Sequence, residues 1–461
     1  MRSILEPDGF AEATGVAAAF AAGLGALARA PLPAPLAHEA QRALANVLGL
    51  AVGAAHHPGV DAIVAAAHVL GGPPAAPVLG RSERADAHFA ALAAGLAAHV
   101  DDFDDTHLAT VIHPGAACLA VLVALAEETA PSGTTSLSAF ALGCEAQLRL
   151  GVAISPEHYD RGWHITGTCG AAGAAVTAAL LLGFDDAALA RALRLAMTMP
   201  LGHREAFGTM AKAFHPGKAA ANGILAARLA AQGADAPADV VEHPRGFAAA
   251  LSTRFDPAQM LDALGEHWEL AENTYKPYPC GIVAHPSIDA ALALRARVEP
   301  GAIESLRAHC HPLVPELMGN PDPQDGLEAR FSAIHGIAAA LCDGRVGLPQ
   351  YEAERVRRAD VRALRAKTSL VPNPDVARDA ARLEARLRDG TTVEEYVAHA
   401  RGSTARPLTD AELFAKVRLL VEPQLGERSG DRLVDAVLTI EGAPSLDAVL
   451  ASAAPEKHLR V

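Results

Sequence analysis

The chain has 461 residues, of which 51% are hydrophobic, 20% are charged and only 4% are aromatic, and its formal net charge is −14. This length is too great for one hydrophobic core, so we expect two domains. The negative net charge argues against nucleic acid as a partner, because a phosphate-binding surface needs clustered lysine and arginine. An acidic protein can still bind an anionic substrate where its positive charge gathers in one cleft.

Cysteine usage and the N-terminal segment both favour a cytoplasmic protein. The six cysteines are scattered without a C-x-x-C pair, which predicts neither a zinc site nor a disulfide framework. An apolar run over residues 15–28 resembles a signal peptide, but Glu6, Asp8 and Glu12 precede it where a basic region belongs. The run is also too short to span a membrane. We therefore expect it to be the first helix of the fold, with no membrane as a partner.

Up to about residue 265, segments rich in Ala and Leu alternate with short Gly, Pro and His breaks. Small apolar side chains of this kind favour close helix–helix packing. No βαβ alternation is evident, so a Rossmann-type fold is not expected. The pattern predicts helices over 36–54, 59–70, 86–100, 115–128, 134–152, 170–182, 186–197, 216–232 and 258–265.

The residue pattern of the sequence changes after about residue 268. Three segments mix β-branched and charged residues in a way that suits short strands, with Pro and Asn breaks between them. These segments are Ser305–His311, Arg355–Leu364 and Thr391–Ala398. We therefore expect a smaller α+β domain over residues 268–400.

Helix is expected to resume after this domain. Thr409 followed three residues later by Glu412 is a capping-box pattern at the start of an apolar-periodic stretch. The tail, residues 401–461, is expected to return to the helical domain formed by residues 1–267. The predicted fold class is mainly α, with a large all-helical domain and an inserted smaller α+β domain.

The densest chemical signal is the acidic run between His99 and His107, which places four aspartates within five positions. Such carboxylates repel one another unless cations, donors or protonation relieve them. On a helix, Asp102 and Thr106 would share one face at i,i+4, presenting a general base and a hydroxyl donor. The alternative is a solvated acidic helix end, which the apolar helices on either side disfavour.

A rival interpretation takes Asp101-Asp102-x-x-Asp105 as the D-D-x-x-D magnesium motif of all-helical isoprenoid synthases. Those enzymes need a second acidic cluster and an aromatic pocket for a carbocation. The chain has no second Asp-rich run of that type, and its aromatic content is low. We therefore expect no metal site.

Three His-Pro pairs precede Ala-rich segments, at His113, His215 and His285. A residue before proline is pushed toward extended geometry, and proline is favoured at the first position of a helix. Each histidine is thus expected beside a helix N-terminus, which attracts carboxylates. A single pair is best explained as a helix-starting turn with a packed imidazole, but three together favour a site.

Two further stretches contribute candidates. His164 precedes a segment whose glycines, at 167, 170 and 173, predict close helix packing and not a nucleotide-binding loop. Lys212 and Lys276 are two of only six lysines in the chain. They offer the fixed positive charge that an anionic substrate needs in a net-negative protein.

As a set, the stretches DFDDTH, RGWHITGT, AKAFHPGKAAANG and KPYPCGIVAHP resemble the MmgE/PrpD family. This family includes 2-methylcitrate dehydratase, cis-aconitate decarboxylase and iminodisuccinate epimerase. The resemblance extends from about residue 10 to about residue 417. It implies a helical domain with a smaller α+β lid domain, a site in the cleft between them, a homodimer, and chemistry that needs neither cofactor nor metal.

The resemblance also implies the residues of the site. The catalytic positions fall on Asp102, His113, His164 and Lys212, and the substrate-binding positions on Thr106, Lys276 and His285. Lysines and helix N-termini would bind the carboxylates of a small di- or tricarboxylate, and Asp102 or a histidine would take the α-proton. His113 or His164 would then donate a proton, and the assignment of acid and base stays open.

From the sequence we expect a lyase of the 2-methylcitrate dehydratase type, which removes water after α-proton abstraction. An epimerase and a cis-aconitate-type decarboxylase are alternatives within the family. Two departures weaken the transfer of decarboxylase activity: the spacing between Thr106 and His113, and His335 at a position that usually holds tyrosine. A non-catalytic helical scaffold is the alternative from another class.

Overall fold

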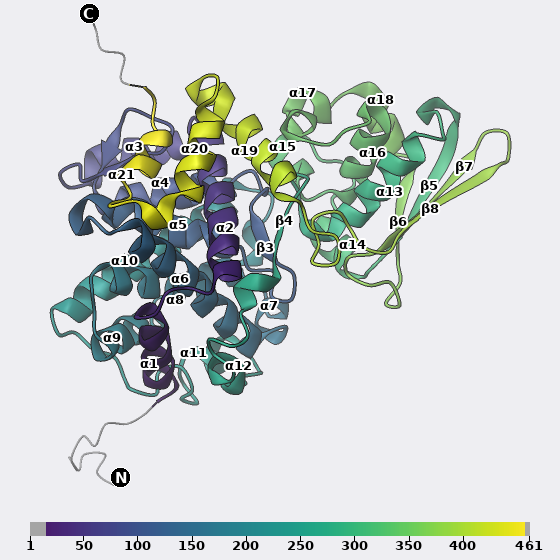
Figure 1. Ribbon diagram of the computed structural model, residues 1–461. Coiled ribbons are helices and arrows are strands. Elements are labelled where there is room, and N and C mark those ends of the chain that lie inside the picture. The colour runs from purple at the N-terminus through teal and green to yellow at the C-terminus, as the bar shows by residue number, and fades with distance from the viewer. Residues whose placement is uncertain (1–14, 457–461) are drawn as a thin grey trace, which may run out of the picture.

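The computed structural model describes residues 15–456, and its elements form two bodies (Figure 1). Apolar side chains from 17–275 and 408–453 pack into one core, and those from 278–385 pack into another. We call these parts the helical body and the smaller body. The fold is mainly α, as predicted, and the acidic residues 6, 8 and 12 lie outside the described range.

The helical body is organised around α8 (Ile165–Leu181), which contacts α5, α6, α9 and α10. A Cβ atom added to Gly167 or Gly173 would lie 2.5 Å from a backbone oxygen of a neighbouring segment, which confirms the predicted close packing. The other helices of this body are α1 (Val16–Ala28), α2 (Ala34–Gly53), α3 (Pro58–Leu70), α4 (Ala87–His99), α5 (Pro114–Thr129), α6 (Gly133–Ile154), α7 (Glu157–Asp160), α9 (Asp186–Ala196), α10 (Met210–Ala231), α11 (Phe247–Leu251), α12 (Ala258–Leu261), α19 (Asp410–Leu425), α20 (Ser429–Leu438) and α21 (Asp447–Ser452).

One helix start differs from the prediction in an informative way. The pair His215-Pro216 does not open a helix but lies inside α10, which begins at Met210. The hydroxyl of Thr209 accepts a hydrogen bond from the Ala211 amide and caps α10 six residues before His215. The polar cap therefore decides the start of α10, and the prediction based on the His-Pro pair was wrong here.

The helical body also holds two short antiparallel ladders, so it is not entirely helical. The first pairs β1 (Ala76–Pro77) with β2 (Arg84–Ala85), and the second pairs β3 (Asp105–His107) with β4 (Asn273–Tyr275). The β3–β4 ladder joins segments that lie 168 residues apart, pairing Thr106 with Thr274.

The acidic run is therefore a turn and a strand, and the predicted shared helical face of Asp102 and Thr106 was wrong. Helix α4 ends at His99, and Asp102 has a left-handed backbone with φ of 49°. Carbonyl groups of the run accept hydrogen bonds from side-chain cations instead of from amides one turn later. The acidic run thus lies outside the helix, where side-chain cations bind its carbonyl groups.

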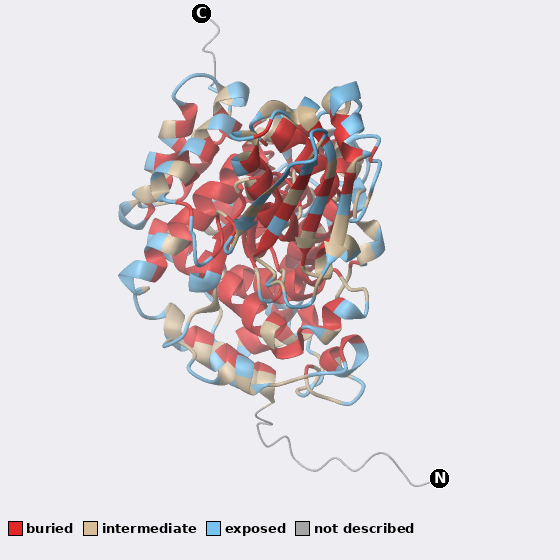
Figure 2. Cartoon of the chain, turned by 90° about the vertical axis from the view of Figure 1, so that its right-hand side faces the viewer, coloured by how far each residue is buried: buried red, intermediate tan, exposed pale blue. Residues whose placement is uncertain are grey.

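The smaller body packs helices against a four-stranded sheet of order β6-β5-β7-β8, in which only β5 and β6 run parallel. Buried and exposed residues alternate along β5 and β7, and Figure 2 shows these stripes with the buried helices behind them. Its elements are α13 (His285–Arg295), β5 (Ile303–Cys310), α14 (Leu313–Met318), α15 (Gly326–Ala329), α16 (Ala333–Asp343), α17 (Ala353–Val356), α18 (Ala359–Arg365), β6 (Thr368–Pro372), β7 (Ala381–Leu387) and β8 (Thr392–Val397).

Two of the three predicted strands in this region are confirmed. β5 and β8 occupy the first and last of them, but residues 355–364 fall in α17 and α18. Val361 and Leu364 are buried three positions apart, which is helical spacing and not the alternation of a strand. The prediction for this segment weighted β-branched content above periodicity.

The chain returns to the helical body through α19. The Thr409 hydroxyl accepts from the Glu412 amide, and the Glu412 carboxylate accepts from the Thr409 amide, which confirms the capping box. α19 packs on α2 and α20 and lies close to the junction of the two bodies (Figure 1). By length and composition α6 resembles a membrane span, but 94% of its most apolar 18-residue stretch is buried inside the fold.

Candidate active site

Three helices of the helical body begin at one cavity. His113 is the N-cap residue of α5, His164 is the N-cap residue of α8, and Lys212 lies in the first turn of α10. Free backbone N–H groups and the helix dipole attract anions at such positions. Asp102, Thr106 and Lys276 line the same cavity. The structure therefore brings together six of the seven residues proposed from the sequence.

His285 is the exception. It begins α13 and is buried, but it does not line the cavity. Its Nε2 atom lies 3.2 Å from the Cys280 carbonyl oxygen, and its ring packs edge-on against Tyr278. Burial lowers the pKa of His285 to about 3, so the ring is neutral at physiological pH. The structure assigns this histidine to the packing behind Lys276, and its expected contact with substrate is not supported.

The smaller body supplies an apolar wall of the cavity, in which Phe331 lies next to the Lys212 ammonium group. The wall consists of Ile282, Val283, Leu317, Met318 and Phe331. The space open to the centres of water molecules measures about 40 Å³, which is room for a few waters. The cavity is therefore small, and its lining combines cationic and apolar residues.

Asp102 is held between two lysines. Its Oδ1 atom forms ion pairs with the Nζ atoms of Lys212 and of Lys276, the latter at 3.2 Å. Burial by itself raises the pKa of Asp102, but the two ammonium groups outweigh it and hold the pKa well below its usual value. A carboxylate with so low a pKa is a weak base, so Asp102 suits charge balance better than proton abstraction.

Lys212 is enclosed as well as paired. Its Nζ atom lies 5.4 Å from the ring centroid of Phe207 and 5.3 Å from that of Phe331. The two rings stack on each other with their centroids 5.4 Å apart. Burial lowers the pKa of Lys212 while Asp102 opposes that shift. The two aromatic rings hold the ammonium group near the N-terminus of α10, where it lines the cavity.

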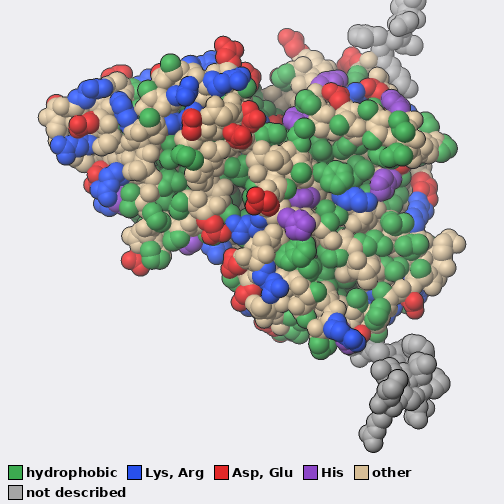
Figure 3. Space-filling view, turned by 180° about the vertical axis from the view of Figure 1, so that it is seen from behind, with side chains coloured by type: hydrophobic (Ala, Val, Ile, Leu, Met, Phe, Trp, Pro, Cys, Tyr) green, Lys and Arg blue, Asp and Glu red, His purple; other side chains and the backbone are tan. Residues whose placement is uncertain are grey.

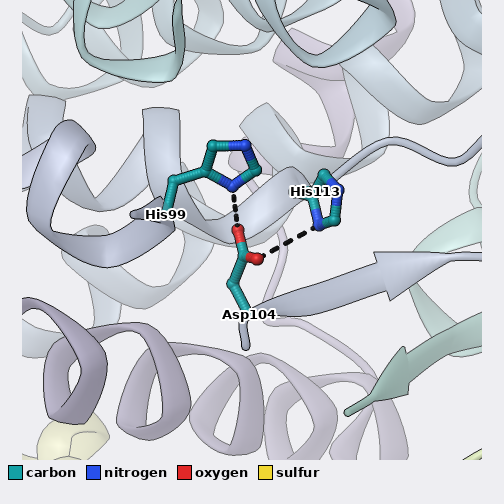
Figure 4. A group of neighbouring side chains, drawn as sticks. All are labelled: His99, Asp104 and His113. Atoms are coloured by element: carbon teal, nitrogen blue, oxygen red, sulfur yellow. Dashed lines mark hydrogen bonds and ion pairs between the residues drawn. The ribbon is translucent and has the colours of Figure 1, made fainter. Parts of the chain in front are cut away.

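Asp104 links two histidines beneath the cavity (Figure 4). Its carboxylate lies 2.6 Å from Nδ1 of His99 and 3.2 Å from Nδ1 of His113. All three side chains are buried. Burial opposes ionisation of Asp104, but the two ring donors hold its pKa well below the ordinary value. Asp104 is therefore a carboxylate that accepts a hydrogen bond from His99 and lies within ion-pair distance of His113.

These contacts fix the tautomer of His113. Its Nδ1 atom lies 3.0 Å from the Asp105 carbonyl oxygen and also faces the Asp104 carboxylate, and both can only accept. The proton of neutral His113 is therefore on Nδ1, and Thr106 Oγ1, 3.1 Å away, accepts as well. Burial lowers the pKa of His113. In the free protein its Nε2 atom consequently carries a lone pair, as a general base requires.

His164 has a different partner. Its Nδ1 atom lies 2.8 Å from Nδ1 of His215, and its ring stacks on that of His99 at a centroid distance of 5.6 Å. Burial holds the pKa of His164 well below its ordinary value. His113, His99, His164 and His215 thus form a continuous row of buried imidazoles along the cationic side of the cavity.

Within residues 15–456, His99, Asp104 and His113 form a group with the donor types of a metal site. The Nδ1 atoms of His99 and His113 are, however, already hydrogen-bonded, to Asp104 at 2.6 Å and to the Asp105 carbonyl oxygen at 3.0 Å. An ion bound by these atoms would have to replace those hydrogen bonds. The geometry therefore fits a hydrogen-bonded relay better than a metal centre.

Comparison with known proteins agrees with this site. The MmgE/PrpD N-terminal domain matches residues 9–260, and the MmgE/PrpD C-terminal domain matches residues 278–441. The chain belongs to the MmgE/PrpD family. It is 31% identical to cis-aconitate decarboxylase of Mus musculus over 373 residues, covering 77% of this chain and 75% of that protein.

Other relatives bear the same name. Cis-aconitate decarboxylase of Homo sapiens is 29% identical over 371 residues, covering 77% of this chain and 76% of that protein. The protein of that name from Aspergillus terreus (strain NIH 2624 / FGSC A1156) is 24% identical over 405 residues, covering 80% of this chain and 81% of that protein. The family and these relatives together identify this chain as an enzyme of the lyase type.

Several residues of this MmgE/PrpD site were not predicted as its members. Asp104 and His99 lie in the acidic run, but only the tertiary contact with His113 shows what they do. His215 was noted as a helix-opening residue and not as the partner of His164. Tyr159, which lies on the short helix α7, also lines the cavity, and no sequence pattern indicated this role.

Proposed function

We propose that this chain is a cofactor-independent lyase that decarboxylates a small tricarboxylate of the cis-aconitate type. The observation that carries the proposal is the division of the cavity into two unlike sides. Lys212, Lys276 and the N-termini of three helices form the cationic side, and five apolar residues of the smaller body form the other. The names of the relatives agree with this choice of reaction.

The two sides place the carboxylates of such a substrate in different surroundings. Carboxylates on the cationic side are neutralised by ammonium groups and backbone N–H groups. A carboxylate against Leu317, Met318 and Phe331 loses solvation, and its conversion to uncharged CO2 relieves that cost. The cavity therefore favours loss of the carboxylate that lies on the apolar side.

The reaction then follows from the residues present. The C–C bond to the apolar-side carboxylate breaks, CO2 leaves, and the electron pair passes into the carbon chain beside the double bond. The carboxylates held by Lys212 and Lys276 stabilise the resulting negative charge. The imidazole of His113 or His164, neutral in the free protein, takes up a proton from water when the anionic substrate binds, gives that proton to carbon and becomes neutral again. One proton is consumed and one CO2 released per turnover.

A 2-methylcitrate-type dehydratase is the second candidate. The lone pair on Nε2 of His113 favours it, because dehydration begins with removal of an α-proton. His335, at the position where a tyrosine is usual, is buried and hydrogen-bonded to the Gln350 carbonyl oxygen, outside the cavity. This departure also favours the dehydratase over the decarboxylase.

Nuclear magnetic resonance in deuterated water separates the candidates. Purified protein is mixed in turn with cis-aconitate, 2-methylcitrate and iminodisuccinate. We expect one CO2 released and one deuterium incorporated per cis-aconitate. An alkene formed from 2-methylcitrate without CO2 would establish the dehydratase, and exchange of deuterium without net product would establish the epimerase. Asp102→Asn and His164→Ala serve as controls, since a non-catalytic scaffold would show no activity for either variant to lose.

We also propose that the protein forms a homodimer. Large apolar side chains of α10 are exposed, including Met210, Phe214, Leu225 and Leu229. Seen from behind, hydrophobic side chains cover much of the helical body, whereas the smaller body carries many charged groups (Figure 3). Exposed apolar surface of this kind marks association sites. Light scattering coupled to size-exclusion chromatography tests the proposal by the molar mass in solution.

A further inference from the structure

Three consecutive carbonyl groups of the acidic run are each bound by a buried cation from a different part of the chain. These pairs are Asp101 with Arg330, Asp102 with Lys276, and Phe103 with Lys416. We call the three cations the carbonyl clamp. Lys276 also lines the cavity, but Lys416 and Arg330 do not. What these two do there is not explained by contact with substrate.

Lys416 comes from α19, in the segment that returns from the smaller body. Its Nζ atom lies 2.5 Å from the Phe103 carbonyl oxygen and 3.1 Å from the Lys276 carbonyl oxygen. The same atom lies 3.9 Å from the centroid of the Phe103 ring. Its side chain is buried, and no carboxylate of residues 15–456 forms an ion pair with it. Burial lowers the pKa of Lys416 to about 7, and its amine donates hydrogen bonds to these two carbonyls in its charged or its neutral form.

Arg330 approaches the run from the opposite side. It follows α15 in the smaller body and is buried. Its Nη2 atom lies 2.8 Å from the Asp101 carboxylate, and Nη1 donates to the carbonyl oxygens of Asp101 and of Pro279, the latter at 3.2 Å. One guanidinium thus ties the smaller body to the residue just before Asp102.

Between these two anchors lies Asp102, with its left-handed backbone at φ 49°. A non-glycine residue in that region is strained and persists only where its surroundings hold it. We infer that Lys416 and Arg330 are positioning residues: by holding the carbonyls on either side of Asp102, they keep its strained backbone and hence its ion pairs with Lys212 and Lys276 in place. Both cations act through the backbone of the run and touch no reacting atom.

The inference rests on the proposed function only for its kinetic readout. Lys416→Met removes the charge, Lys416→Arg keeps it, and Arg418→Met removes a cation of the same helix that pairs with Asp431 at the surface. We expect kcat to fall about 30-fold in Lys416→Met with a KM change below about 3-fold, because small displacements of a catalytic group cost rate steeply. Lys416→Arg should recover most of the rate, and Arg418→Met should match the wild type.

A second readout does not need turnover. Hydrogen–deuterium exchange of the peptide covering residues 100–107 should be about 10-fold faster in Lys416→Met than in Arg418→Met. If the wild-type protein transforms no polycarboxylate, the proposed function fails, and the exchange measurement alone decides the inference. Equal exchange in the two variants overturns it. Should Lys416→Met not fold, Arg330→Gln takes its place, with faster exchange expected and wild-type exchange overturning the inference.

Discussion

The Nδ1 atoms of His164 and His215 lie 2.8 Å apart in a buried contact between the start of α8 and the first turns of α10. A hydrogen bond between two ring nitrogens needs one donor and one acceptor, so one Nδ1 carries a proton and the other does not. Burial lowers the pKa of His215 to about 4 and that of His164 further below its ordinary value. The pair is therefore uncharged in the free protein, and His215 sets which nitrogen of His164 faces the cavity as donor.

Replacing His215 should impair the reaction without emptying the cavity of its charged groups. His215→Phe keeps the ring volume but leaves His164 free to adopt either tautomer and to rotate. We expect kcat to fall about 10- to 100-fold, as is common when the partner that orients a functional imidazole is lost. The control is His68→Phe, since His68 is exposed on α3. Unchanged kcat in steady-state assays would show that the contact does not orient His164.

Asp104 should be as important as the histidines it joins. Asp104→Asn retains the size of the side chain but presents an amide that can offer a proton to Nδ1 of His113. The neutral imidazole would then carry its proton on Nε2, and the carboxylate that stabilises the imidazolium would be gone, so kcat should fall at least about 100-fold. The melting temperature and the affinity for a non-reactive tricarboxylate are measured in parallel. A variant with wild-type kcat would contradict the tautomer assigned to His113.

Metal removal should leave the enzyme active. The Nδ1 atom of His99 is hydrogen-bonded to Asp104 and that of His113 to the Asp105 carbonyl oxygen, so an ion would have to displace both contacts. We expect dialysis against EDTA to change the rate by less than about 2-fold. The control is a second sample to which Zn²⁺ or Mn²⁺ is returned after dialysis. Activity that disappears with the chelator and returns with either ion would identify these three residues as a metal centre.

His285 should matter for stability and not for chemistry. His285→Gln can still donate to the Cys280 carbonyl oxygen, and no cavity surface is lost. We expect kcat and KM within about 3-fold of the wild type and a lower melting temperature, because a buried ring that packs on Tyr278 is removed. His113→Gln, which alters a cavity residue, should lose at least about 100-fold. A loss of kcat of similar size in both variants would show that His285 contributes to the substrate site.

His113 and His285 show which features of the site a single sequence can predict. Both precede proline at the start of a helix, as the local pattern predicted, but the expected non-helical backbone is found only at His113, since His285 is already helical. Only the tertiary fold decides that α5 begins at the cavity and α13 begins behind it. Local patterns thus predicted most helices and, with the family resemblance, the convergence of Asp102, His164 and Lys212.

The parts that could not be predicted depend on contacts between distant segments. Phe103 and Lys416 are 313 residues apart, and Asp101 and Arg330 are 229 apart. Neither pair leaves a periodic or spacing signal in a single sequence. The conformation of the acidic run was also predicted wrongly. Its aspartates were expected on a helix, whereas side-chain cations hold its carbonyl groups in a turn. Pairing of β3 with β4 was hidden for the same reason.

The last prediction concerns Asp105, the first residue of β3, whose buried carboxyl group contacts the start of α5. Its Oδ2 atom accepts from the Gly115 amide and from Asn273, while burial and the nearby Asp104 raise its pKa to about 7. The ordinary value is near 3.9, so between about pH 4 and pH 7 the folded protein holds a proton that the unfolded chain has released, and stability falls as pH rises through that window. Asp105→Asn lacks this dependence. We expect its free energy of unfolding, relative to the wild type, to improve by up to about 4 kcal/mol between pH 4 and pH 8. Urea unfolding at both pH values measures the change, with the surface variant Asp239→Asn as control. A difference that stays constant with pH would mean that Asp105 is ionised throughout, and that cations of the site reach it after all.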